Sequence, residues 1–153
     1  MLDLIIKNGQ CYIDGELKDV DVGIKDGKIK QIGRILEDTK EEINAEGHTV
    51  LPGCIDTQTH FREPGSTDTE DLHSGSRAAI VGGITAVFEM PNTNPPTSNI
   101  KEFRKKLDLA KNRMYCNYAF YFGATAENVN QLSELKDLEG CCLLYTSPSP
   151  RDS

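Results

Sequence analysis

The sequence predicts an α/β protein that begins with a short β-rich region. Two observations support this prediction. Residues 2–50 consist of short β-branched runs separated by tight-turn dipeptides. From residue 51 onward, strand-like runs alternate with amphipathic, helix-like runs. Because parallel strands need long crossover connections, which are usually helices, this alternation indicates parallel βαβ units.

The β-rich region is divided by turn dipeptides. Its strand-like runs are LDLIIKNG, QCYIDGEL, DVDVGIKDGKIKQIG and HTVLPG. Asn8-Gly9, Asp14-Gly15 and Asp26-Gly27 suit two-residue hairpin turns, because Asn, Asp and Gly tolerate the positive φ that such turns require. A sheet this small is marginal on its own, so we expect it to pack against another part of the protein.

The second region contains three strand–helix pairs. The predicted strands are 51–61, 84–90 and 116–124, and the predicted helices are 68–83, 98–113 and 126–140. Gly82-Gly83 is expected to end the first helix and to form a helix-to-strand turn. The second helix shows the clearest pattern, with Ser98 or Asn99 as its N-cap. Its apolar stripe contains Ile100, Phe103, Leu107 and Ala110.

Charge and hydropathy exclude several classes of partner. The chain has 24 acidic and 17 basic residues, a net charge of −7 and a pI of about 4.9. This balance disfavours nucleic acid and anionic membranes as partners, although a pocket can still attract an anionic small molecule. No apolar run approaches the roughly 18 residues of a membrane span, and MLDLIIKNGQ lacks the basic start of a signal peptide. We predict a cytoplasmic protein. Its five cysteines show no CxxC spacing and are expected to be reduced thiols.

The last segment, CLLYTSPSPRDS, continues neither pattern. One interpretation is a polar terminal tail. We favour another: it resembles the translation of a sequencing adapter, and it begins where a fourth strand is due. We therefore expect residues 142–153 to be a non-native tail on a truncated protein.

His60 is the first candidate site residue. It closes an apolar strand, and active sites of parallel α/β barrels lie at the carboxyl ends of strands. Two histidines separated by a single residue on a strand point to the same side and can bind one metal ion. Here the residue two positions before His60 is Gln58, so this pair of histidines is absent. Spacing alone does not decide whether His60 is a metal ligand or a hydrogen-bonded structural histidine. Arg62, on the same side, suits either recognition of a substrate carboxylate or a surface ion pair.

A proline-rich loop, MPNTNPP, ends the strand 84–90 at the same edge as His60. It would either contact a ligand or simply stop the strand. His48 and His73 are interpreted as structural histidines. No GxxxxGK or GxGxxG motif is present, so nothing indicates a phosphate-binding loop.

The order of these motifs resembles a known family. LPGCIDTQTHFREPG, SGSRAAIVGGITAVFEMPNTNPPTS and NYAFYFGAT together resemble the dihydroorotases of the cyclic amidohydrolase superfamily, over residues 1–141. REPG and MPNT are the most specific segments. The resemblance implies the N-terminal part of a metal-dependent-hydrolase TIM (β/α)8 barrel, preceded by a small β-sandwich (composite) domain. Residues 1–50 would belong to the composite domain and residues 51–141 would form the first three βα units.

The resemblance also implies a reaction and site residues. The family carries out zinc-dependent, reversible cyclisation of N-carbamoyl-L-aspartate to dihydroorotate in pyrimidine biosynthesis. His60 matches a metal ligand, and Arg62 and Asn92 match groups that bind the substrate carboxylate. One or two Zn²⁺ ions are expected, and the parent protein is expected to form a homo-oligomer. The remaining ligands and the general acid/base would lie beyond residue 141, so we assign no catalytic residue here and expect the 153-residue chain to be inactive.

Gln58 is the departure from the family pattern, because it stands where the family usually has its first histidine ligand. A neutral amide is a weaker zinc ligand than imidazole, which puts a two-metal centre in doubt. Two alternatives therefore stay open: an allantoinase- or hydantoinase-like cyclic amidase, and a non-catalytic dihydroorotase-like subunit.

Overall fold

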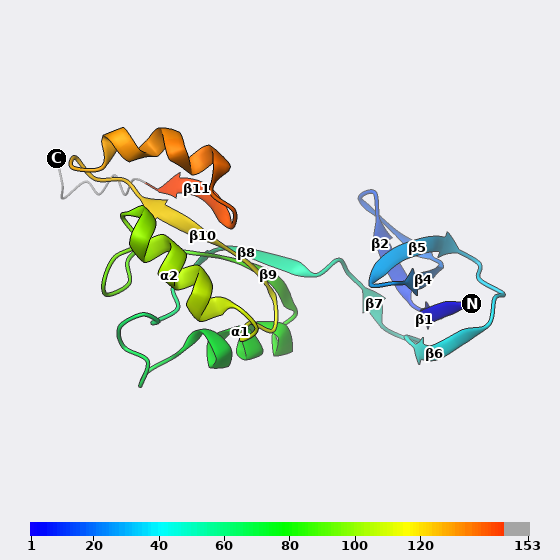
Figure 1. The fold of residues 1–153 in the computed structure, drawn as a ribbon. Helices are drawn as coiled ribbons and strands as arrows, with labels where there is room; N and C mark the ends of the chain where they lie inside the picture. The colour runs from blue at the N-terminus through cyan, green and yellow to red at the C-terminus, as the bar shows by residue number, and fades with distance from the viewer. Residues whose placement is uncertain (146–153) are drawn as a thin grey trace. The chain divides into compact units, whose positions relative to one another are not determined.

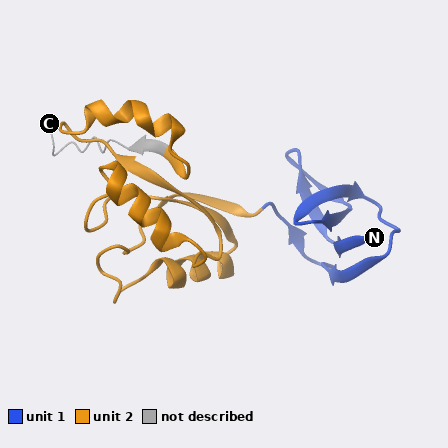
Figure 2. Cartoon of the chain, in the orientation of Figure 1, with its two compact units in different colours: residues 1–52 blue, residues 53–153 orange. Residues whose placement is uncertain are grey.

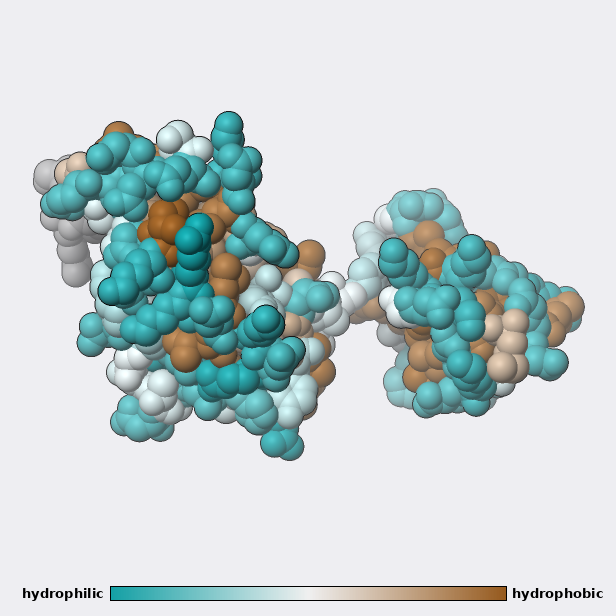
Figure 3. Space-filling model, viewed as in Figure 1, coloured by the Kyte–Doolittle hydropathy of each residue, from teal (hydrophilic) through white to brown (hydrophobic). Residues whose placement is uncertain are grey.

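The computed structural model describes residues 1–145. It divides the chain into two compact units, Met1–Pro52 and Gly53–Ser153 (Figure 2). Most of the expected non-native tail, residues 146–153, lies outside the described residues. The face of each unit shown in Figure 3 is mostly hydrophilic. Within residues 1–145, none of the helices is long and apolar enough to cross a membrane.

Unit 1 contains two small sheets (Figure 1). Their strand orders are β5-β4-β1-β6 and β3-β2-β7. The strands are β1 (Leu2–Lys7), β2 (Gln10–Ile13), β3 (Glu16–Asp19), β4 (Asp21–Lys25), β5 (Lys28–Gly33), β6 (Thr39–Asn44) and β7 (Thr49–Val50). Buried Leu2, Ile5 and Ile35 form a core for this unit.

Two of the three predicted hairpin turns are confirmed. Asp14-Gly15 joins antiparallel β2 and β3, and Asp26-Gly27 joins antiparallel β4 and β5, with positive φ at all four residues. The prediction for Asn8-Gly9 is wrong, because β1 and β2 belong to different sheets. A Cβ atom on Gly9 would lie 2.8 Å from Val50 Cγ2 and 2.9 Å from Ala45 Cβ, so glycine is needed there for close packing.

Strand β6 was not predicted from its sequence, TKEEIN. It pairs in parallel with β1, and five of its six residues are exposed. A strand at the edge of a sheet with charged side chains carries little hydrophobic signal. Its position is therefore decided by pairing with β1 and not by local pattern.

Unit 2 has the predicted alternation of strands and helices. Its parallel sheet has the order β11-β10-β9-β8 (Figure 1). Its elements are β8 (Cys54–Thr59), α1 (Leu72–Val81), β9 (Ile84–Glu89), α2 (Ile100–Ala110), β10 (Asn117–Gly123), the 3-10 helix η1 (Val129–Asp137) and β11 (Cys141–Tyr145). Four parallel strands agree with the predicted βαβ units, while closure into an eight-stranded barrel stays a prediction.

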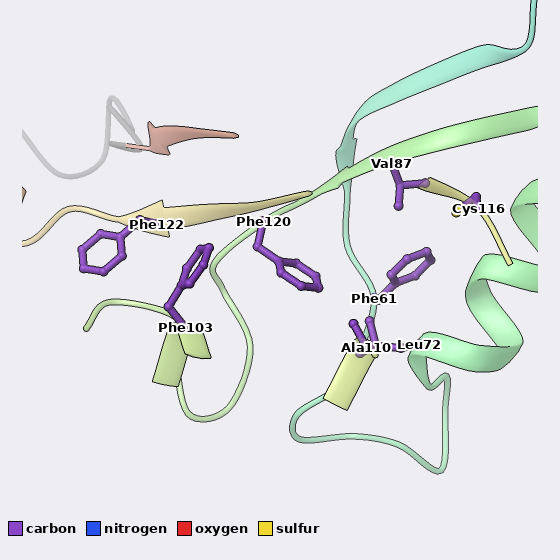
Figure 4. Packing of buried hydrophobic residues seen from close by; sticks show 8 residues of the cluster. All are labelled: Phe61, Leu72, Val87, Phe103, Ala110, Cys116, Phe120 and Phe122. Carbon is purple, nitrogen blue, oxygen red and sulfur yellow. The ribbon is translucent and has the colours of Figure 1, made fainter. Parts of the chain in front are cut away.

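The core of unit 2 lies between the sheet and its helices (Figure 4). Phe103 on α2 is fully buried, and its ring centroid lies 6.3 Å from that of Phe120 and 6.4 Å from that of Phe122, both on β10. The predicted apolar stripe on α2 is confirmed, since all four of its residues belong to this cluster or pack against it. Asn99 is the N-cap, and its side chain accepts a hydrogen bond from the Glu102 N–H at 2.9 Å.

Two predictions for the end of unit 2 need correction. The third helix is a 3-10 helix, η1, rather than an α-helix. The segment from Cys142 was expected to lack strand structure, yet Cys141–Tyr145 form β11 beside β10. The residues CCLLY are apolar and precede both prolines of the tail, so their backbone N–H groups are available for pairing. The proposed origin of the tail in a sequencing adapter stays a prediction.

Candidate active site

A pocket of about 320 Å³ lies at the carboxyl ends of β8, β9 and β10. Parallel strands end at the same edge of a sheet, and ligands of α/β proteins bind beside such edges. The pocket is lined by His60, Met90, Pro91, Asn92, Pro96, Ser98, Gly123, Ala124 and Thr125. Two of the three predicted site residues, His60 and Asn92, therefore lie in one pocket, although they are far apart in sequence.

His60 and Asn92 are joined by a hydrogen bond. The distance from His60 Nδ1 to Asn92 Oδ1 is 3.0 Å. Since an amide oxygen can only accept, the imidazole carries its proton on Nδ1. The Nε2 lone pair of the neutral ring is then available for a metal ion, and metal-ligating histidines are commonly oriented by a partner in this way.

The described residues offer one side chain suited to bind a metal ion at this pocket, but not a complete set of metal ligands. Within residues 1–145, no three His, Cys, Asp or Glu side chains are grouped closely enough to hold a metal ion. Zinc sites use three or four protein ligands. His60 is therefore suited to supply one ligand, and a full shell would need groups from outside this segment.

Gln58 and Arg62 lie on either side of His60, and neither lines the pocket. Gln58 is exposed on β8, and its backbone N–H donates to Asp56 Oδ1 at 2.9 Å. Arg62 is also exposed, and its guanidinium has no carboxylate partner among residues 1–145. The structure thus leaves the Arg62 side chain available for an anion, while its predicted role in substrate binding stays a prediction.

The loop after β8 is fixed by an ion pair that sequence reasoning did not identify. Arg113 binds buried Glu63 through two nitrogens, with Nη1–Oε1 at 2.8 Å and Nη2–Oε2 at 3.0 Å. Glu63 Oε2 also accepts the Leu72 N–H at 2.9 Å, at the start of α1. These contacts tie the residues that follow His60 to α1 and to the segment after α2.

Phe61 anchors the same loop by packing. Its side chain is buried in the core of unit 2. A Cβ atom on Gly75 of α1 would lie 2.6 Å from the Phe61 ring, so glycine at this position makes room for the aromatic ring. The backbone of neighbouring His60 is held in place as a result.

Beneath the loop after β9 lies a buried ion pair between Glu89 and Lys106. Both side chains are fully buried, and Lys106 Nζ contacts Glu89 Oε2. Burial raises the pKa of Glu89 to about 7 and lowers the pKa of Lys106, while each charge partly offsets the shift of the other. Two sequence features could have indicated this pair: a Glu closing the apolar strand ITAVFE, and a Lys three residues after Phe103 on the apolar side of α2.

Asn128 connects two of the loops that form the pocket. Its buried amide nitrogen donates to Ser98 O at 2.7 Å and to Gly123 O at 2.8 Å, and its Oδ1 accepts the Thr125 N–H at 2.9 Å. A single side chain therefore satisfies backbone groups from the loops after β9 and β10. Nothing in the segment TAENVN distinguishes this asparagine from an ordinary turn residue.

The other two histidines lie outside the pocket, as expected for structural residues. His73 Nε2 lies 3.3 Å from Tyr115 Oη, and the two rings meet edge to face. His48 Nδ1 lies 3.0 Å from Glu46 O in unit 1.

Comparison with known proteins identifies the family. Residues 49–141 match the model of the amidohydrolase family, and the chain belongs to this family. Allantoinases of several Escherichia coli strains are 41% identical over 137 residues, which cover 89% of this chain and 30% of the allantoinase. The chain thus spans about 30% of the length of these curated relatives.

Solved structures agree with this assignment. The L-hydantoinase (dihydropyrimidinase) of Arthrobacter aurescens has a TM-score of 0.86 at 28% identity, over 97% of this chain and 35% of that protein. A D-hydantoinase has a TM-score of 0.78 at 31% identity, over 94% of this chain and 32% of that protein. The predicted cyclic amidohydrolase class is confirmed. The narrower prediction of a dihydroorotase stays a prediction, and the allantoinase- or hydantoinase-like alternative is closer to these relatives.

Proposed function

We propose that the whole protein containing this segment is a metal-dependent cyclic amidase that opens the ring of a cyclic ureide by hydrolysis. Allantoin, hydantoin and dihydroorotate all contain such a ring, in which an amide carbonyl is bonded to a ring nitrogen. The main support is the pocket at the carboxyl ends of the strands, in which His60 and Asn92 are hydrogen-bonded, in a chain of the amidohydrolase family.

Five of the nine residues that line the pocket have a defined part in this proposal. His60 Nε2 would hold a zinc ion together with ligands from outside residues 1–145. When bound, the metal supplies Lewis-acid polarisation of the ring carbonyl. Asn92 keeps the Nδ1 proton of His60 in place by accepting its hydrogen bond. Met90, Pro91 and Pro96 provide apolar walls that exclude water from the flat faces of a bound ring.

Allantoin is the first substrate to test, because the relatives at 41% identity are named allantoinases. A second candidate, dihydroorotate, is favoured by one specific observation. It differs from the other two in carrying a carboxylate, and the exposed Arg62 guanidinium, two residues after His60, has no carboxylate partner among residues 1–145. Arg62 therefore separates the candidates.

The test uses the full-length product of the gene, purified with zinc. Ring opening is measured with allantoin, hydantoin and dihydroorotate. We expect one of these rings to be opened, and we expect a chelator to abolish the reaction. If dihydroorotate is the substrate, Arg62→Ala should lower kcat/KM about tenfold to a hundredfold, since a charged hydrogen bond contributes about 1.5–3 kcal/mol. No turnover of any cyclic ureide by a zinc-loaded protein would reject the proposal and would favour the non-catalytic subunit.

A further inference from the structure

We infer that Lys106, held by Glu89, is a positioning residue that fixes the loop Met90–Thr97 so that Asn92 meets His60. Neither Lys106 nor Glu89 lines the pocket, so both act through the loop. The inference rests on the proposed function only in taking the pocket as the site of reaction.

The ammonium of Lys106 lies under the loop and contacts oxygen atoms from three of its residues. Lys106 Nζ lies 3.3 Å from Met90 O, 3.4 Å from Thr93 Oγ1 and 3.1 Å from Thr97 Oγ1. Met90 and Thr93 lie on either side of Asn92 in the sequence. One buried cation therefore holds the chain both before and after the residue that contacts His60.

The loop closes around these contacts through its own hydrogen bonds. Thr97 N donates to Pro91 O at 2.9 Å, and Thr93 Oγ1 donates to Pro95 O at 3.0 Å. The hydroxyl groups of Thr93 and Thr97 are 3.3 Å apart. Both hydroxyls also face Lys106, so removing its ammonium would take away a donor that they share. The loss matters most for Thr97, whose side chain is buried and cannot turn to water instead.

Stability alone does not explain this buried pair. Burial shifts the pKa of both groups toward their neutral forms, which is the direction expected when desolvation outweighs the attraction between the two charges. Apolar residues of similar volume would fill the same space between α2 and β9. Among residues 1–145, no N–H or O–H group donates to Glu89 Oε1. The contacts that apolar residues could not replace are those between Lys106 and the loop.

Glu89 holds Lys106 in place from the strand side. It is the last residue of β9 and directly precedes Met90. Its carboxylate contacts Lys106 Nζ, while the ring of Phe120, whose centroid is 5.2 Å from Nζ, lies beside it on β10. The ammonium is thereby confined to the point where the strand ends and the loop begins.

The test compares variants of the full-length protein by hydrogen–deuterium exchange and by kinetics. Lys106→Met combined with Glu89→Gln removes both charges together, so that no unpaired charge is buried. Thr97→Val removes one loop contact and keeps the ion pair. Lys105→Met is the matched control, because Lys105 is exposed on the same helix and its one ion pair within residues 1–145 is with Glu102.

We expect exchange within residues 90–98 to accelerate about tenfold or more in the double variant, while peptides of β10 and α2 keep their protection. We also expect kcat/KM to fall about tenfold to a hundredfold, as for groups that orient a metal ligand. Thr97→Val should show the same loop-specific change to a smaller extent, and Lys105→Met should match the wild type.

A folded double variant with wild-type exchange in residues 90–98 would overturn the inference. If the double variant does not fold, Thr97→Val provides the test. Wild-type hydrogen–deuterium exchange of residues 90–98 in that variant would also overturn the inference. The exchange measurement needs no substrate. A failure of the proposed function would instead appear as absent turnover in the wild type, whatever the loop does.

Discussion

The ion pair between Glu63 and Arg113 allows a quantitative test of how the loop after β8 is held. We consider Glu63→Gln, Arg113→Met and the double variant. Arg113→Met keeps most of the side-chain volume and removes both charged hydrogen bonds, at 2.8 and 3.0 Å. Glu63→Gln keeps the shape and one acceptor for the Leu72 N–H, but it removes the charge.

The expected size of the effect follows from burial. Glu63 is 7% exposed, so Arg113→Met leaves a buried carboxylate with the Leu72 N–H as its remaining donor. Breaking a fully buried pair costs about 3–5 kcal/mol. Because the Arg113 side chain is 35% exposed, solvent screening reduces this value. We expect Arg113→Met to lower the free energy of unfolding by about 2–3 kcal/mol and Glu63→Gln by about 1–2 kcal/mol.

The assay is urea unfolding of the four proteins, followed by fluorescence or circular dichroism. We expect a coupling energy of about 1–2 kcal/mol between the two sites, so the double variant should lose less than the sum of the single variants. Arg104→Met is a suitable control, because Arg104 is exposed on α2 and makes no ion pair within residues 1–145. A coupling energy near zero would refute the conclusion that this pair holds the loop.

Three further predictions concern the core, a helix cap and pH. Phe103→Ala should lower the free energy of unfolding by about 3–5 kcal/mol, because the ring is fully buried. Ile80→Ala is the control and should cost far less, because Ile80 is 40% exposed. Equal losses of unfolding free energy for the two variants in urea would contradict the core assignment. Asn99→Ala should cost about 1 kcal/mol by removing the N-cap of α2, and unchanged thermal unfolding would argue against that cap. Burial raises the pKa of Glu89 from 4.5 to about 7, so the folded state binds this proton more tightly than the unfolded state. The corresponding stabilisation is fully present below pH 4.5 and is lost as the pH rises through about 7. In a pH series, the difference in unfolding free energy between the wild type and Glu89→Gln should therefore change over this range, and a constant difference would refute the shift.

Local chemistry made much of the fold predictable. The alternation of strands and helices after residue 51, the apolar stripe of α2 and its cap at Asn99 all follow from patterns within a few residues. Asp14-Gly15 and Asp26-Gly27 were predictable for the same reason, because their positive φ angles are a local requirement. Features that depend on a partner in space were missed or wrong, as with exposed β6 and with Asn8-Gly9, which links two different sheets.

For the candidate site, too, the placement of residues along the strands was predictable, whereas their contacts in space were not. His60 and Asn92 could be placed at one edge of the sheet because parallel strands end together, but their direct hydrogen bond could not be derived from sequence. The pair of Glu89 and Lys106, and the three hydrogen bonds of Asn128, join residues separated by a strand, a helix or a loop. Glu89 and Lys106 left a signal in their apolar surroundings, at the end of the strand ITAVFE and on the apolar side of α2, whereas Asn128 looks like an ordinary turn residue until the fold buries it.

The most direct test of the account is the zinc content of the full-length protein, measured together with ring opening of the cyclic ureides, in the wild type and in His60→Ala. We predict that the wild type binds zinc and opens one of these rings. His60→Ala should lose zinc and activity together. Its thermal unfolding midpoint should match that of the metal-free wild type, because His60 is exposed and its side chain adds little to the packing. A His60→Ala protein with full zinc content and wild-type turnover would contradict the assignment of His60 as a metal ligand in this pocket.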